Sequence, residues 1–352
     1  MRPRSIAIGC GAAAFLGLAV LGVGAWMTWR HFTAPVPLPA PVTLLPADGV
    51  GLMIMRLEPD NLWVKGAFDH MGRDSDEPAP TGKLAPFEVV WTFRPQETGT
   101  DGHFVALSLS PTGRLFGLSI DIALWKAGRN GEPLVHRVDH AGEGLTSFPG
   151  ARIPGYFFAR SSTIGWGSDL EATQRGVDLL VAAENPGGAP PAGNQAVQAL
   201  LPPEGSHPVR GAVIDRDGSL GRLMASLPGA VGAAPALTGV SGLSFVLDPL
   251  SATEATGEVV LHFAPSVPQQ DREKMAGDLA GWLKQISFGG LVLESEPHLD
   301  PSATTVSVKA SGLNGLFDAA VRAMARAKRT MDQEKESEPA AGESDQSSST
   351  FQ

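Results

Sequence analysis

Hydrophobic and polar residues alternate with a period of two in several parts of the chain. The clearest stretches cover residues 87–94, 243–247 and 254–263. Successive side chains of a strand point to opposite faces, so this period predicts strands with one buried face and one largely solvated face. Strands of this kind suit antiparallel sheets. The pattern over residues 87–94 places Phe87, Val89, Trp91 and Phe93 on the buried face and Glu88, Thr92 and Arg94 on the opposite one.

Three other segments have the helical period of 3.6 residues. Apolar positions fall on one face over residues 275–286, over residues 313–324 and over residues 170–180. Ser266 with Gln269, and Ser168 with Glu171, have the spacing of a capping box at a helix start. Amphipathic helices that alternate with half-buried strands indicate an α+β fold. We therefore predict a mostly antiparallel sheet with helices packed on one side.

A weak internal repeat divides this body into two halves. The segment Leu44–Gly49 (LLPADG) recurs as Leu200–Gly205 (LLPPEG), and each copy precedes an apolar strand and an acid-rich turn. A matched order of this kind indicates two related α+β units. The predicted halves cover residues 44–184 and 200–330, and residues 185–199 form a Gly/Pro-rich linker with a short helix. The repeat leaves open whether the halves share one sheet or pack as two domains.

The N-terminal region has the pattern of a membrane anchor. Residues 6–27 contain no charge, and a helix of this length spans roughly 33 Å, enough to cross the lipid hydrocarbon core. We therefore predict a short cytoplasmic segment (residues 1–5) and a transmembrane signal anchor that contacts the bilayer (residues 6–29). Arg2 and Arg4 precede the apolar run, and the positive-inside rule then places the following residues outside the cytoplasm. A cleaved signal peptide is the alternative, and it exports the same body.

Two further segments flank the body. Residues 30–43 carry four prolines, which favour an extended and semi-rigid spacer. Residues 331–352 contain six acidic residues against one lysine and too few apolar residues to fold, so they are predicted to be a disordered acidic tail. The formal net charge of the chain is −10, and it has no lysine-rich run. Nucleic acid is therefore not a predicted partner, because binding its phosphates needs clustered basic residues.

The sequence offers one weak candidate for chemistry, a speculative polar cluster of His136, Asp139 and His140. The preceding residues indicate a strand, in which residues four apart are separated by roughly 13 Å. This spacing does not suit a shared metal ion, and the HExxH pattern is absent. Nucleophile-elbow, phosphate-loop and dinucleotide motifs are also absent, and the only cysteine, Cys10, lies in the apolar run. No cofactor is predicted.

These features predict a membrane-anchored protein of the bacterial envelope with its body in the periplasm or on the cell surface. The leading hypothesis is a non-enzymatic interaction or scaffold module whose partner is another envelope protein. One alternative is a ligand-binding sensor with a pocket between the two halves. The other is a membrane-tethered hydrolase that acts near His136, Asp139 and His140.

Overall fold

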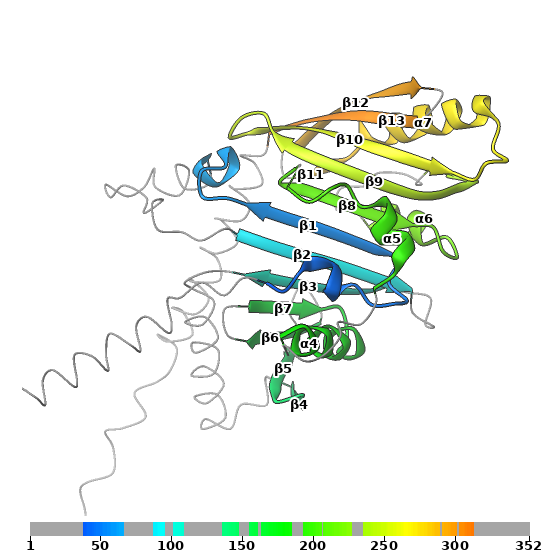
Figure 1. The fold of residues 1–352 in the computed structure, drawn as a ribbon. Coiled ribbons are helices and arrows are strands. Elements are labelled where there is room, and N and C mark those ends of the chain that lie inside the picture. The colour runs from blue at the N-terminus through cyan, green and yellow to red at the C-terminus, as the bar shows by residue number, and fades with distance from the viewer. Residues whose placement is uncertain are drawn as a thin grey trace, which may run out of the picture.

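The body is built on one large antiparallel sheet with helices packed against it (Figure 1). The computed structural model describes residues 38–66, 87–95, 101–108, 136–147, 155–160, 163–184, 193–205, 207–226, 235–288, 291–300 and 303–312. The predicted anchor at residues 6–29, the predicted helix at 313–324 and the predicted tail at 331–352 lie outside these residues. In the part of the chain that is described, no helix has the length and apolar character needed to span a membrane.

The strands of the first half are β1 (Gly51–Leu57), β2 (Phe87–Pro95), β3 (Asp101–Ser108), β4 (His136–His140), β5 (Glu143–Ser147), β6 (Tyr156–Arg160) and β7 (Thr163–Gly167). Those of the second half are β8 (Val209–Ile214), β9 (Val240–Pro249), β10 (Glu254–Phe263), β11 (Ser287–Phe288), β12 (Leu291–Asp300) and β13 (Ala303–Ser311). The helices are η1 (Pro41–Leu44), a short helix at residues 62–66, α4 (Leu170–Glu184), α5 (Gln195–Leu200), α6 (Ser219–Ser226) and α7 (Gln269–Leu283).

The order of strands in the sheet is β11-β12-β13-β10-β9-β8-β1-β2-β3-β7-β6-β5-β4, and all the pairs are antiparallel. β1 and β8 meet at the centre, so the two halves share one continuous sheet. Read outward from this centre, each half presents its first, second and third strands and then its last strand. The predicted antiparallel α+β fold is confirmed at this level.

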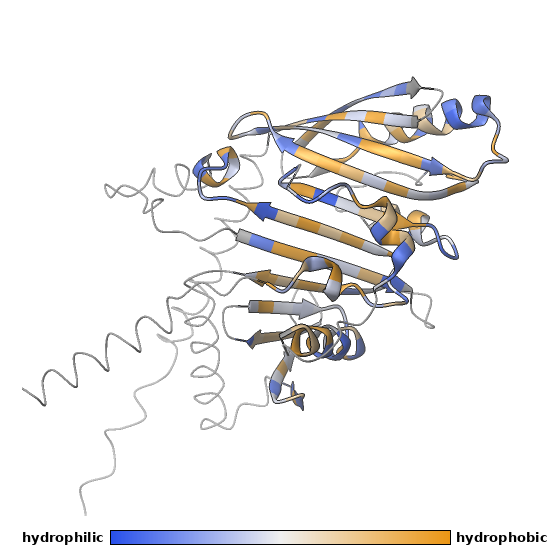
Figure 2. Cartoon of the chain, viewed as in Figure 1, coloured by the Kyte–Doolittle hydropathy of each residue, from blue (hydrophilic) through white to orange (hydrophobic). Residues whose placement is uncertain are grey.

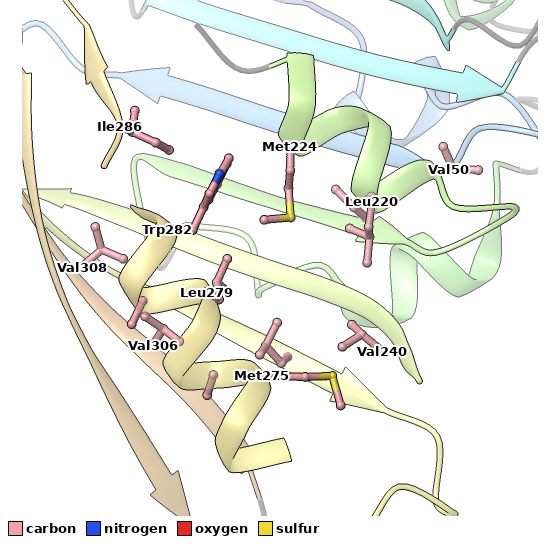
Figure 3. Packing of buried hydrophobic residues seen from close by; sticks show 14 of the residues in the cluster. Val50, Leu220, Met224, Val240, Met275, Leu279, Trp282, Ile286, Val306 and Val308 are labelled. Carbon is pink, nitrogen blue, oxygen red and sulfur yellow. The ribbon is translucent and has the colours of Figure 1, made fainter. Parts of the chain in front are cut away.

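Helices cover both faces of the sheet, and the prediction of a single helical side is wrong. One apolar cluster, drawn in Figure 3, packs α6 and α7 against strand residues such as Val213 and Val306. The other packs α4 and α5 against the opposite face, where Leu52 and Ala212 lie. Ala212 and Val213 are neighbours on β8, are both buried and point to opposite faces. The central strands are therefore hydrophobic along most of their length, as Figure 2 shows.

The predicted solvated face of β2 is also buried. Glu88, Thr92 and Arg94 expose only 9%, 3% and 7% of their surface. β2 lies between β1 and β3, and η1 and α4 cover this face of the sheet, so most of the face packs against other parts of the chain. Glu88 lies at the edge of this packed region, beside a cavity described below. A period of two shows which polar and apolar side chains share a face of the strand. It does not show whether another part of the chain covers that face.

The helix starts differ in detail from the predicted capping boxes. α7 begins after Pro268, which makes no side-chain cap, so Ser266 does not act as the cap. Before α4 the capping group is the Asp169 carboxylate, which accepts a hydrogen bond from the amide of Ala172. Glu171 instead forms an ion pair with Arg94 of β2. Both helices exist where the hydrophobic period predicts them, because burial of the apolar face decides helix formation more strongly than the cap does.

Candidate functional site

The predicted polar cluster lies on β4, an edge strand of the sheet. His136 and Asp139 are exposed, and Asp139 lies in an ion pair with Arg137. The Nε2 atom of His140 lies 2.8 Å from Oδ1 of Asp178 on α4. The strand geometry is confirmed, so the two histidines lie four residues apart along an extended backbone. The structure therefore does not bring the three residues together as one site.

A charged cavity lies at the boundary of the two halves, where β1 pairs with β2 and β8. Its volume is about 500 Å³, within the usual range for small-molecule sites. We call it the junction cavity. Its described lining residues are Pro41, Ile54, Arg56, Glu58, Asp60, Asn61, Leu62, Glu88, Glu204, Gly205, His207, Pro208, Arg210 and Pro249. The first half and the stretch before it supply one wall, and the loop and strand after Leu201 supply the other.

Two buried side chains of opposite charge form the inner part of the junction cavity. Glu88 is 9% exposed and Arg210 is 7% exposed. In the register of the sheet, Glu88 lies opposite Arg56, and Arg210 lies opposite Ile54. Both side chains therefore lie on the same face, on either side of β1. Among the described residues, neither forms an ion pair at contact distance. The charge of Arg56 still acts on Glu88, and the charge of Glu204 acts on Arg210.

Each of these two groups keeps some hydrogen bonding from the backbone. The Leu38 amide donates to the Glu88 carboxylate, and Nη1 of Arg210 donates to the Pro202 carbonyl. Burial raises the pKa of Glu88 above its ordinary 4.5, against the opposing charge of Arg56. Burial also lowers the pKa of Arg210, but an arginine remains charged at neutral pH. A cationic group of a ligand could therefore pair with Glu88, and an anionic group could pair with Arg210.

The rim of the junction cavity is more acidic and more exposed. Glu58 accepts a hydrogen bond from Arg56 at 3.1 Å, and both side chains are about half exposed. Nδ1 of His207 lies 2.7 Å from Oδ2 of Asp248. In total, four carboxylates and two guanidinium groups line the cavity among the described residues. The rim therefore favours positive charge, while Arg210 offers a single buried position for an anion.

The symmetry of the β1–β8 ladder provides an internal comparison for this cavity. The ladder is centred on Met53 opposite Gly211. At one end the Arg56 amide donates to Pro208, and at the other the Ile214 amide donates to Val50. A rotation of 180° about the centre therefore exchanges the two ends of the ladder and keeps each residue on its face.

At the other end of the ladder, the positions equivalent to the charged residues of the junction cavity hold apolar residues or glycine. The position equivalent to Arg210 is Leu52, and the position equivalent to Arg56 is Ile214. Glu88, opposite Arg56, corresponds to Gly242, opposite Ile214. A Cβ on Gly242 would lie 2.5 Å from Cδ1 of Leu200, so α5 fills the space above it. One end of the ladder is thus packed core, and the other is an open cavity with unpaired charges.

A second group of charges, in which only Arg94 is buried, has a structural role. Arg94 contacts Asp48 and Glu171, and Arg175 contacts the same two carboxylates. The hydrogen bond from Arg94 lowers the pKa of Glu171. These four side chains connect the Leu44–Gly49 corner, β2 and α4. Their charges are already matched within the network, so this group does not offer a ligand an unpaired charge.

An apolar cavity of about 290 Å³ lies on the other face of the sheet, between α6 and α7. Trp91 and Trp282 line it. Leucine, methionine, valine and phenylalanine side chains supply the rest of its described lining. Apart from the indole N–H groups of these two tryptophans, the described lining residues carry no polar side-chain group.

Within the described residues, no group of three or more histidine, cysteine, aspartate or glutamate side chains is placed to hold a metal ion. None of the residues around the junction cavity stands out in the sequence as a site. The one readable signal is Arg210, a lone charge in the apolar run Val209–Ile214. The burial of Glu88 has no such signal, because it depends on η1 and on neighbouring strands.

Replacement of Glu88 by glutamine should raise the melting temperature of the full chain at neutral pH by a few degrees. Because the pKa of Glu88 is raised in the folded state, its stabilising contribution is full below pH 4.5 and is lost as the pH rises through the folded pKa. Glutamine removes the buried charge and keeps an acceptor for the Leu38 amide. Differential scanning calorimetry at pH 7.5 and at pH 4 measures both limits.

The control for this prediction is Glu258→Gln on β10, where the glutamate is exposed. This variant should melt like the wild type at neutral pH. An equal gain in melting temperature for Glu88→Gln at both pH values would contradict the burial of an ionised Glu88.

Comparisons with known proteins add no family assignment. No family model matches the chain, and no curated protein or solved structure matches it.

Proposed function

We propose that this chain is a membrane-anchored envelope protein whose extracytoplasmic body binds a partner or ligand without catalysing a reaction. Residues 6–29 hold it in the lipid bilayer, and the part of the predicted spacer that precedes Leu38 separates the body from the membrane surface. Both assignments come from the sequence pattern. Leu38 and Pro41 already pack in the body. We further propose that the two halves descend from one duplicated unit. The repeated Leu-Leu-Pro corner and the matched strand order support this origin.

The observation that carries the binding role is the junction cavity with Glu88 and Arg210, which form no ion pair with any described residue. Buried charges without a contacting partner cost stability, and the equivalent end of the same ladder is filled by apolar residues. A body selected for stability alone would fill both ends. The described lining contains no serine, threonine or cysteine that could act as a nucleophile. These features favour recognition of a charged molecule, either free or as part of an envelope protein partner.

Photo-crosslinking in intact cells tests this role. A benzophenone amino acid replaces Leu62, which is 42% exposed and lines the junction cavity. We expect an adduct of defined mass that disappears when Glu88→Gln or Arg210→Leu is added to the same chain. The matched control places the benzophenone at Val292, which is 55% exposed on β12 and is not among the lining residues. An absent adduct at Leu62, or one insensitive to both cavity variants, would refute the binding role.

A further inference from the structure

The charges of the junction cavity are arranged in two zones that define the chemistry of a ligand. Arg210 is the buried cation, and it lies on the opposite side of β1 from Glu88. Strand spacings of about 4.8 Å and a rise of about 3.4 Å per residue put their two Cα atoms roughly 12 Å apart. The cavity that both residues line has a volume of about 500 Å³, which gives room for a small molecule.

The outer zone adds negative charge on one side of this pair. Glu58, Asp60 and Glu204 line the cavity together with Glu88, and Glu204 is close enough to influence both Glu88 and Arg210. Arg56 already has a carboxylate partner in Glu58. The cavity thus presents one uncommitted cation at depth and several carboxylates towards the opening. A ligand that satisfies both zones needs one anionic group and more than one cationic group.

We propose that the junction cavity binds a small zwitterion with excess positive charge, the class to which L-lysine belongs. Its carboxylate lies against the guanidinium of Arg210, which retains donors beyond the one used by the Pro202 carbonyl. One ammonium group lies against Glu88, and the second lies among the carboxylates of the rim. This inference rests on the proposed binding role and specifies its ligand.

Isothermal titration calorimetry on the full chain in lipid nanodiscs tests the ligand class with three probes. L-lysine carries all three charges, 1,5-diaminopentane lacks the carboxylate, and L-norleucine lacks the side-chain ammonium. We expect L-lysine to bind about tenfold or more tightly than either analogue, because each missing charge leaves a buried or rim group unpaired. Equal affinity of all three probes, or no binding of L-lysine at millimolar concentration, would overturn the proposal.

Substitutions of Arg210 and Glu88 test which protein side chain pairs with which charge of L-lysine. Arg210→Leu installs the residue of the equivalent position, and it should abolish the preference for L-lysine over 1,5-diaminopentane. Glu88→Gln should weaken L-lysine binding about tenfold, while Glu258→Gln should leave it unchanged. The circular dichroism spectrum of each variant verifies that the body is folded. Unchanged binding in both folded cavity variants would place the L-lysine site elsewhere and overturn the assignment.

This experiment separates the ligand class from the binding role. If L-lysine fails but the Leu62 adduct depends on Glu88 and Arg210, the cavity binds something of another class and only this inference falls. If the adduct is also insensitive to both variants, the proposed binding role falls with it.

Discussion

Replacing Trp282 by alanine should destabilise the body by about 3–5 kcal/mol, the usual cost of removing a buried tryptophan. Trp282 lies on α7, is 5% exposed and packs in the cluster of Figure 3. It also lines the apolar cavity beside α6, so the substitution enlarges a space that is already unfilled. The surroundings can collapse only partly, and the loss exceeds the transfer free energy of the indole. Thermal unfolding followed by circular dichroism should show a melting temperature lower by roughly 10 °C.

Phenylalanine at the same position distinguishes packing from hydrogen bonding. The indole Nε1 of Trp282 is buried and finds no hydrogen-bond acceptor in the described structure. Trp282→Phe removes this unpaired donor and keeps an aromatic ring, so it should cost less than about 1.5 kcal/mol. A loss as large as that of the alanine variant would mean that the indole nitrogen, and not the ring volume, stabilises the contact between α7 and the sheet.

The hydrophobic pattern predicts the strands and helices well, since each signal is local. Residues 87–94 alternate with a period of two, and β2 forms there. Residues 275–286 follow the helical period, and α7 covers most of them. The burial of both faces of β2 is not local. It arises because β1 and β3 flank the strand while η1 and α4 cover the second face.

The junction cavity depends on this non-local arrangement, which explains why the sequence directs attention to other residues. His136, Asp139 and His140 are close in sequence and carry reactive groups, yet they lie on an exposed edge strand. Glu88 and Arg210 are 122 positions apart, and only the pairing of β1 with both β2 and β8 places them around one cavity. A lone arginine in an apolar strand is the type of signal that sequence reading can use. The position of Glu88 on the same face, across β1, is known only once the strand register is known.

The internal repeat is a case in which a weak sequence signal agrees with the topology. The six-residue corner recurs with four identical residues, and the strand order outward from β1 and β8 matches in both halves. If one unit was duplicated, the two ends of the β1–β8 ladder began as equivalent surfaces. Only one of them now carries Arg56, Glu88 and Arg210 in place of apolar residues or glycine. The proposed binding site at one end would account for that difference.

Replacing Gly165 by alanine should destabilise the first half by about 1–3 kcal/mol, the range for an overpacked core. Gly165 lies on β7, and a Cβ atom there would sit 1.9 Å from Cε1 of Phe158. The ring of Phe158 cannot simply move away, because it stacks on Phe104 at 5.9 Å with an interplanar angle of 7°. Phe104 is itself held over Gly176 of α4, where an added Cβ would come within 2.0 Å of its ring.

The matched substitution Gly277→Ala separates crowding from backbone effects. Gly277 lies on the exposed side of α7, and nothing lies within 4 Å of an added Cβ. Alanine favours a helix over glycine, so this variant should gain about 0.5–1 kcal/mol, with a sign opposite to that of Gly165→Ala. Urea unfolding of both variants gives the two free energies directly. A stable Gly165→Ala protein would mean that Phe158 and Phe104 have another arrangement available, and that the stack does not fix the position of α4 on the sheet.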